Sequence, residues 1–293
     1  SSVSTFEAGS FSQTTAMDGK VIMALGAISG FNELTAASKN PTSFNYVVQL
    51  NLNTSFTGDD NLYTRLKGGE WADEWKKKGN TYHIEAKDTT DDFRVDKMWY
   101  TFPIGEQITA TVGPLIENYY MLAATPSIYK PGALKLFKLG GHSSAFGAST
   151  STGVGLKYQA DNGFASSITV NSKNDANRYG FLTDEDENKV NTQVAYTTDR
   201  YHVSATYTSQ SANWDAWCYS ATEEACDASQ EGADGVALRE WWIPEETGTA
   251  VPSITVGYDS MTHDGHSRAE SSTAVSYTHL RAHETGRNLV CRL

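Results

Sequence analysis

The stretch from residue 46 to residue 66 constrains the fold more than any other part of the chain. Its first arm alternates between a mainly apolar set and a mainly amide or hydroxyl set. These are Tyr46, Val48, Leu50, Leu52, Thr54 and Phe56 against Val47, Gln49, Asn51, Asn53 and Ser55. Successive strand side chains point to opposite sides, so the arm has one apolar and one polar face. Gly58 and Asp59 supply a turn into residues 62–66, which predicts a long β-hairpin.

The same two-residue alternation recurs along the chain and predicts about ten strands. Besides the two hairpin arms, these strands are residues 20–28, 93–102, 107–113, 153–159, 164–171, 190–197, 201–208 and 251–258. Tight turns near Gly58, Gly105, Asn162 and Asp199 alternate with much longer connections. Aromatic residues flank these turns: Phe56, Tyr63, Tyr100, Phe102, Tyr158, Phe164, Tyr196 and Tyr201.

Short turns at one rim, long loops at the other and an aromatic girdle are typical of a transmembrane antiparallel β-barrel. The sequence therefore predicts an all-β chain that forms part of such a barrel, with long extracellular loops and a water-filled lumen. A mean hydropathy of −0.45 argues against a helical membrane protein, and no apolar run approaches the ~20 residues of a spanning helix. Spanning strands leave every second residue polar, so the same value is compatible with a barrel.

Two soluble alternatives compete with the barrel. A secreted β-sandwich that binds glycans would also alternate, but its outer face would usually carry more charged residues than these amide and hydroxyl rows. A soluble β-rich hydrolase is the other alternative. Its best carboxylates are Glu70, Asp73 and Glu74 beside two tryptophans, a spacing that says little about a glycosidase pair. We therefore expect no enzymatic activity.

Charge and cysteine content limit the partners. The net charge of −12 argues against nucleic acid, because no basic stripe is present to neutralise phosphates. No cofactor or metal motif is recognisable, and the acidic run at 184–187 is read as a solvated loop. Cys218 and Cys226 lie close together, and a disulfide between them would imply an oxidising compartment. Two unpaired thiols are the alternative.

Four segments resemble the cyanobacterial outer-membrane porins of the carbohydrate-selective, OprB-type family. They are GKVIMALGAISG (19–30), VVQLNLNTSFTGDDNLYTRLKGG (47–69), MWYTFPIGEQITATVGP (98–114) and GVGLKYQADNGFASSITV (153–170). The resemblance implies a barrel of roughly sixteen strands in the cell outer membrane, of which this chain holds about ten. It also implies a passive diffusion channel for small hydrophilic solutes, either carbohydrates or inorganic ions such as iron.

The same resemblance suggests how the chain is divided. Residues 1–18 are expected to be a linker, residues 19–275 the porin barrel without its last strands, and residues 276–293 a non-native read-through tail. Members of the family typically carry an N-terminal domain that binds the cell wall, and we expect that domain to lie outside this sequence. The expected partners are outer-membrane lipid and small solutes, with a homotrimer as a family-type expectation.

The connection 114–150 is the candidate for a loop folded into the lumen, and its charge is locally positive. We expect its lysines, together with inward-facing cations of the hairpin, to favour anionic or neutral solutes at the pore constriction. These residues are Lys130, Lys135, Lys138, Arg65 and Lys67. The alternative is that the lysines only solvate a surface loop.

Aromatic residues of the long connections form a second candidate site. Their ring faces could stack on sugar rings and guide a carbohydrate through the pore. They are Trp71, Trp75, Tyr119, Tyr120 and Tyr129. The alternative is that these rings pack the loops themselves.

Overall fold

The computed structural model describes residues 14–27, 42–71, 89, 91–124, 150–173, 181–183, 186–211, 214, 232–245, 253–263 and 273–279. These residues form one antiparallel sheet of twelve strands, in which sheet order follows sequence order. The strands are β1 (Thr15–Gly26), β2 (Ser43–Thr54), β3 (Asn61–Glu70), β4 (Arg94–Ile104), β5 (Ile108–Glu117), β6 (Thr150–Gln159), β7 (Phe164–Lys173), β8 (Glu187–Thr197), β9 (Tyr201–Gln210), β10 (Ala233–Trp242), β11 (Ser253–His263) and β12 (Thr273–His279).

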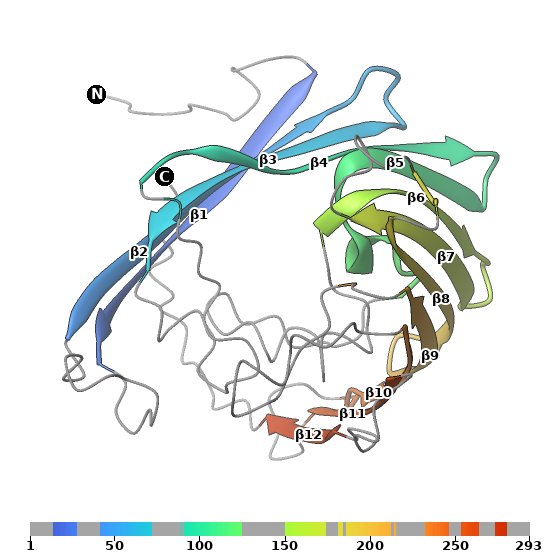
Figure 1. Cartoon of the computed structure of the whole chain (residues 1–293). Helices are drawn as coiled ribbons and strands as arrows, with labels where there is room; N and C mark the ends of the chain where they lie inside the picture. Colours follow the sequence, from blue (N-terminus) through green and yellow to red (C-terminus); the bar gives the residue numbers. More distant parts are fainter. Residues whose placement is uncertain are drawn as a thin grey trace.

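The sheet curls around a central space (Figure 1). A short 3₁₀ helix, η2 (Asn118–Met121), follows β5 and lies on the concave side of the sheet. Within the described residues, β1 and β12 are the two ends of the sheet, and each pairs with one neighbour. The prediction of an all-β, antiparallel chain is confirmed. In the described part of the chain, no helix is long and apolar enough to cross a membrane.

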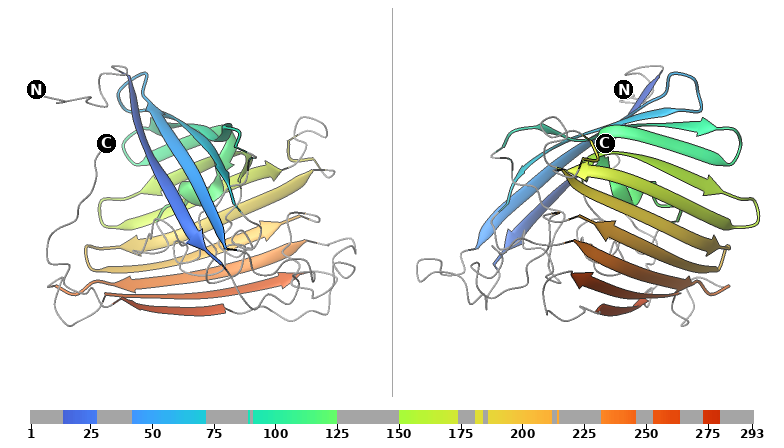
Figure 2. Two further views of the ribbon diagram at one scale, coloured as in Figure 1. Left: turned by 90° about the vertical axis from the view of Figure 1, so that its left-hand side faces the viewer. Right: turned by 45° about the vertical axis from the view of Figure 1, so that its right-hand side comes forward.

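The predicted alternation of short and long connections is also confirmed. Short turns join β2 to β3, β4 to β5, β6 to β7 and β8 to β9, and the hairpins lie side by side in Figure 2. Gly58, Gly105 and Gly163 adopt positive φ angles of 103°, 70° and 91° in three of these turns. Glycine reaches this region without the penalty that a Cβ imposes.

The β2–β3 turn is held by one carboxylate. Asp60 Oδ1 accepts hydrogen bonds from the Ser55 hydroxyl and from the backbone N–H groups of Phe56 and Thr57, each at 2.8 Å. The hydroxyl of Tyr100 in β4 donates to Oδ2. The Tyr100 bond and the backbone donors favour the charged carboxylate, so they hold the pKa of Asp60 well below its usual range. The bond from Tyr100 thus joins the β2–β3 turn to β4.

Two strands were not predicted. β10 lies inside what the sequence suggested was a large loop from 209 to about 250, and β12 follows the last predicted strand. In β10 the outward row contains Val236 and Leu238 and then Glu240, so a charge interrupts the apolar alternation. The sheet also extends beyond the predicted limits of residues 19–275, because β1 begins at Thr15 and β12 reaches His279.

The polarity of the sheet is inverted relative to a soluble protein. On the outer face Val194 and Val203 are 49% and 56% exposed, whereas their neighbours Gln193 and Ser204 are 0% and 3% exposed. Gln193 contacts the segment after η2, which places the polar row on the concave face. A β-sandwich would bury the valines in its core, so the structure contradicts that alternative.

Candidate functional site

The connection after β5 starts by folding against the concave face. The backbone N–H of Ala123 donates to Ser167 Oγ in β7 at 2.9 Å, and that of Ala124 donates to Gln193 Oε1 in β8 at 2.8 Å. Residues 118–124 therefore lie where the sequence predicted that a lumen loop would begin. Lys130, Lys135, Lys138 and Tyr129 lie outside the described residues, so their roles stay predictions.

A cluster of four charges lies beside this segment on the concave face. Arg65 Nε donates to Asp96 Oδ2 at 2.8 Å, and Arg65 Nη2 lies 3.6 Å from Glu117 Oε2. Lys97 Nζ lies 2.8 Å from the same Glu117 oxygen. All four side chains are at most 13% exposed. Arg65 and Lys97 thus face two carboxylates, and the buried Lys67 adds a further positive charge that acts on Asp96.

A β-bulge brings Asp96 into the cluster. The pairing of β3 with β4 shifts between Arg65 and Leu66, so that Arg65 lies opposite Lys97 and Leu66 opposite Val95. Asp96 is the extra residue, and a bulge of this kind re-aims a side chain. Simple alternation from Lys97 would have placed this carboxylate on the outer face.

The cationic site predicted in the hairpin is thus modified by the structure. Arg65 and Lys67 face inward and are each 4% exposed, as predicted. The Arg65 charge, however, is compensated by Asp96 and Glu117. Arg65 therefore contributes a paired charge to the wall, and an excess of positive charge at the constriction stays a prediction.

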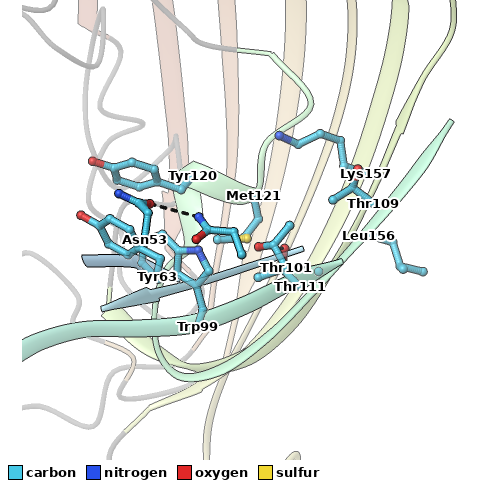
Figure 3. Close-up of a pocket in the computed structure, with 12 residues that line it drawn as sticks. Asn53, Tyr63, Trp99, Thr101, Thr109, Thr111, Tyr120, Met121, Leu156 and Lys157 are labelled. Carbon is cyan, nitrogen blue, oxygen red and sulfur yellow. Dashed lines mark hydrogen bonds between the residues drawn. The ribbon is translucent and has the colours of Figure 1, made fainter. Parts of the chain in front are cut away.

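A cavity of about 290 Å³ opens on the same face (Figure 3). It is lined by Asn53, Asn61, Tyr63, Trp99, Thr101, Thr109, Thr111, Tyr120, Met121, Gly155, Leu156 and Lys157. Asn61 Nδ2 donates to Asn53 Oδ1 at 3.1 Å across its wall. Aromatic, amide and hydroxyl groups therefore share one small site.

Four aromatic rings form a continuous series beside this cavity. The Tyr63 and Trp99 rings stack with centroids 4.4 Å apart, Trp99 and Tyr120 are 5.4 Å apart, and Tyr120 and Tyr119 are 4.6 Å apart. Tyr120 is 42% exposed. The predicted pair Tyr119 and Tyr120 is thus joined by Trp99, which was not predicted as a site residue, and by Tyr63. The sequence analysis assigned Tyr63 to the aromatic girdle, but the structure places its ring on the concave face. The inward row Lys97, Trp99, Thr101 was the available signal.

Trp71 does not join this series. It is 2% exposed and packs against Val47, with Ile22 and Ala24 completing a small apolar cluster on the inner face of β1 and β2. A ring that stacks on a sugar needs an open face, so this packing argues against the stacking role predicted for Trp71. Trp75, the other tryptophan of that prediction, lies outside the described residues.

Lys157 supplies a positive charge to the cavity. It lies opposite Thr109 in the β5–β6 ladder, and Figure 3 shows it across the cavity from Tyr120. Among the residues that the structure describes, Lys157 forms no ion pair with a carboxylate. It therefore differs from Arg65 and Lys97, whose charges are paired.

A second buried ion pair lies on the concave side of β10 and β11. Arg239 Nη2 donates to Asp259 Oδ1 at 2.7 Å, and both side chains are 1% exposed. Arg239 Nη1 also donates to the backbone carbonyls of Leu238 at 2.8 Å and Tyr258 at 3.2 Å. The guanidinium thus joins β10 to β11.

The remaining predicted residues do not add to the site. Cys218 and Cys226 lie outside the described residues, so their disulfide stays a prediction. Within the described residues, no group of His, Cys, Asp and Glu side chains is arranged to hold a metal ion.

An outward apolar face, an inward polar face and alternating turn lengths define the class of fold as that of the outer-membrane porins. The structure aligns with OprB from Pseudomonas putida at a TM-score of 0.50 and 11% identity, covering 86% of this chain and 66% of OprB. OmpF from Salmonella typhi aligns at a TM-score of 0.42 and 9% identity, covering 91% of this chain and 87% of OmpF. The alignment with OprB and the inverted polarity of the sheet confirm the predicted partial porin barrel as the fold.

Sequence similarity is more limited. No family model matches the chain. An uncharacterized protein from Synechocystis sp. is 30% identical over 117 residues, which cover 39% of this chain and 21% of that protein. The match thus spans about a fifth of this curated relative.

Proposed function

We propose that the chain forms part of the wall of a cyanobacterial outer-membrane porin, a passive diffusion channel of the OprB type for small hydrophilic solutes. The inverted polarity of the sheet carries this proposal. Val194 and Val203 are exposed on the outer face, where hydrocarbon would cover them, while Gln193 and Ser204 line the interior. The porin-type fold supports the same location in the outer membrane.

Sugars are the cargo that the cavity fits best. The C–H face of a sugar ring packs on the exposed ring of Tyr120, while its hydroxyls can bond to Asn53, Asn61 and the threonines. A volume of about 290 Å³ lies just below the usual range of ligand pockets, ~300–1,000 Å³, which suits one ring. Lys157 favours neutral or anionic solutes over cations such as iron. A homotrimer and a wall-binding N-terminal domain stay predictions from the resemblance.

Cysteine scanning tests the orientation of the wall. In the full chain with its three native cysteines changed to serine, Thr109→Cys and Val112→Cys place a thiol on the inner and the outer face of β5. In liposomes, we expect a charged, membrane-impermeant maleimide to label Thr109→Cys at least about tenfold faster. A bimane label at position 112 should be quenched by brominated lipid chains, as expected for a lipid-facing strand residue. Equal labelling and no lipid quenching would contradict the porin assignment.

Tyr120→Ala tests the sugar proposal. An open aromatic face contributes about 0.5–1.5 kcal/mol in a ring contact, so we expect sugar binding to weaken about two- to tenfold. Sugar-induced block of the ion current in planar bilayers measures this affinity. Tyr201→Ala, which removes an exposed tyrosine of the outer face, is the matched control. Similar losses in both variants would show that the aromatic series does not bind the sugar. The assignment as a channel would not be affected by that result.

A further inference from the structure

Three buried side-chain oxygens lie where the long connection joins β7 to β8. Among the residues that the structure describes, Asp186 Oδ2, Asn188 Oδ1 and Ser172 Oγ have no hydrogen-bond partner. Asp186 is 4% exposed and Ser172 is 1% exposed. Buried polar atoms without a partner are rare in folded proteins, because they lose their bonds to water and gain nothing in return. Three such oxygens together therefore point to a ligand that they share.

Strand pairing brings these three residues together. Ser172 and Asn188 lie directly opposite each other in the β7–β8 ladder, so their side chains share one face of the sheet, with Cβ atoms about 4.5–5.5 Å apart. Asn188 Nδ2 donates to the backbone carbonyl of Asp186 at 3.3 Å and to that of Thr183 at 2.8 Å. Both bonds require the NH₂ group, so they fix the orientation of the amide and leave Oδ1 as its acceptor.

Asp186 adds a negative charge to this group. Its Oδ1 accepts a hydrogen bond from the backbone N–H of Glu187 at 2.9 Å, and in the described part of the chain Asp186 forms no ion pair. The sequence analysis read residues 184–187 as a solvated loop, whereas the structure buries Asp186. Buried charges in proteins are paired with an opposite charge or coordinate a metal ion. The carboxylate therefore indicates that the shared ligand is a cation.

We propose that Asp186, Asn188 and Ser172 bind one Ca²⁺ ion. They offer a carboxylate, an amide carbonyl and a hydroxyl, and Ca²⁺ prefers oxygen ligands, of which it takes about six to eight. Water molecules complete the coordination. Mg²⁺ demands a stricter octahedral geometry and gives up water reluctantly, so it should bind more weakly. The set has a single carboxylate and thus differs from the centres of several His, Cys, Asp or Glu side chains considered above.

The position of the site agrees with a weak, external calcium site. The ion would join the end of β7 to the start of β8 on the side of the long connections, which face the outside of the cell in a porin. Extracellular calcium sites typically have a Kd of about 10⁻⁴–10⁻³ M, and a small number of charged ligands lowers the affinity. This expected affinity rests on the proposed outer-membrane location, whereas binding itself depends only on the three oxygens.

Isothermal titration calorimetry of the full chain in detergent, freed of metal with a chelator, tests the inference. The probe is CaCl₂ in 0.15 M NaCl, which screens weak binding to surface charges. We expect one saturable site with a Kd of about 10⁻⁴–10⁻³ M. Asp186→Asn keeps the shape of the side chain but removes the only charged ligand, so it should weaken Ca²⁺ binding at least about tenfold.

Urea unfolding gives a second readout of the same site. A ligand that binds only the folded chain stabilises it, so 10 mM CaCl₂, about ten times the upper Kd, should raise the urea midpoint of the wild-type chain. The same addition should leave the midpoint of Asp186→Asn almost unchanged. Ser172→Ala, which removes a neutral ligand, should weaken binding less than Asp186→Asn does.

Asp161→Asn is the matched control, because Asp161 is an exposed carboxylate in the turn at the other end of β7. This variant should keep the affinity and the urea shift of the wild-type chain. The absence of saturable Ca²⁺ binding by the wild-type chain, or an unchanged affinity in Asp186→Asn, would overturn the inference. Equal weakening by Asp161→Asn would also overturn it, since general surface charge would then explain the binding. Labelling at Thr109→Cys and Val112→Cys still decides the porin assignment, so the two failures can be distinguished.

Discussion

Replacing Arg239 alone with methionine is expected to lower the free energy of unfolding by about 3–5 kcal/mol, because the change leaves a buried carboxylate without its cation. Asp259 and Arg239 are both 1% exposed and are joined by a 2.7 Å contact. The two backbone carbonyls that Arg239 bonds would also lose their donor. Urea unfolding in detergent, followed by tryptophan fluorescence, measures the change.

The double variant Arg239→Met/Asp259→Leu separates the pair from the packing around it. Apolar side chains of similar volume often replace a buried ion pair at little cost, so most of the lost stability should return. Arg94→Met is the control, because the Arg94–Asp92 pair is 3.8 Å long and its side chains are 60% and 76% exposed. We expect a loss of less than about 1 kcal/mol there. Equal losses in the two single variants would show that burial does not strengthen the contribution of Arg239.

Local alternation was sufficient to predict most strands, because the direction of a strand side chain depends only on its place in the strand. The opposite faces of Val48 and Gln49, and of Val194 and Gln193, follow from this rule. β10 was missed because Glu240 stands in its apolar row. The carboxylate costs little at the girdle, but it removes the periodic signal.

The composition of the site was harder to predict, because it depends on pairing between strands. Asp96 turns inward only because the β3–β4 ladder contains a bulge. Arg65 is neutralised by this Asp96 and by Glu117 at the end of β5, which comes within 3.6 Å. The Tyr63–Trp99 stack likewise requires that these residues lie opposite each other in adjacent strands. None of these contacts can be predicted from the sequence of one strand alone.

The distinction between paired and unpaired cations leads to a prediction about ion selectivity. Charge reversal at Lys157 by Lys157→Glu is expected to change the ratio of cation to anion permeability by roughly 25- to 600-fold. One unit charge about 4 Å from a passing ion in water contributes about 1 kcal/mol, or a factor of about five. The substitution changes the charge by two units, which favours a cation by about 25-fold and disfavours an anion by up to the same factor. The direction is toward cations, because a carboxylate then faces the cavity in place of an ammonium group.

Reversal potentials of the full chain in planar bilayers under a KCl gradient measure this ratio. The lower salt concentration should be about 0.01 M, where the Debye length is about 30 Å and screening is weak. Arg94→Glu makes the same charge change at an exposed position at the end of β4, 60% exposed and outside the cavity, and should shift the ratio much less. If the two variants shift it equally, or Lys157→Glu leaves it unchanged, the ion path does not run past the cavity. A large shift confined to Lys157→Glu would place that path beside the aromatic series, since Lys157 and Tyr120 line the same cavity.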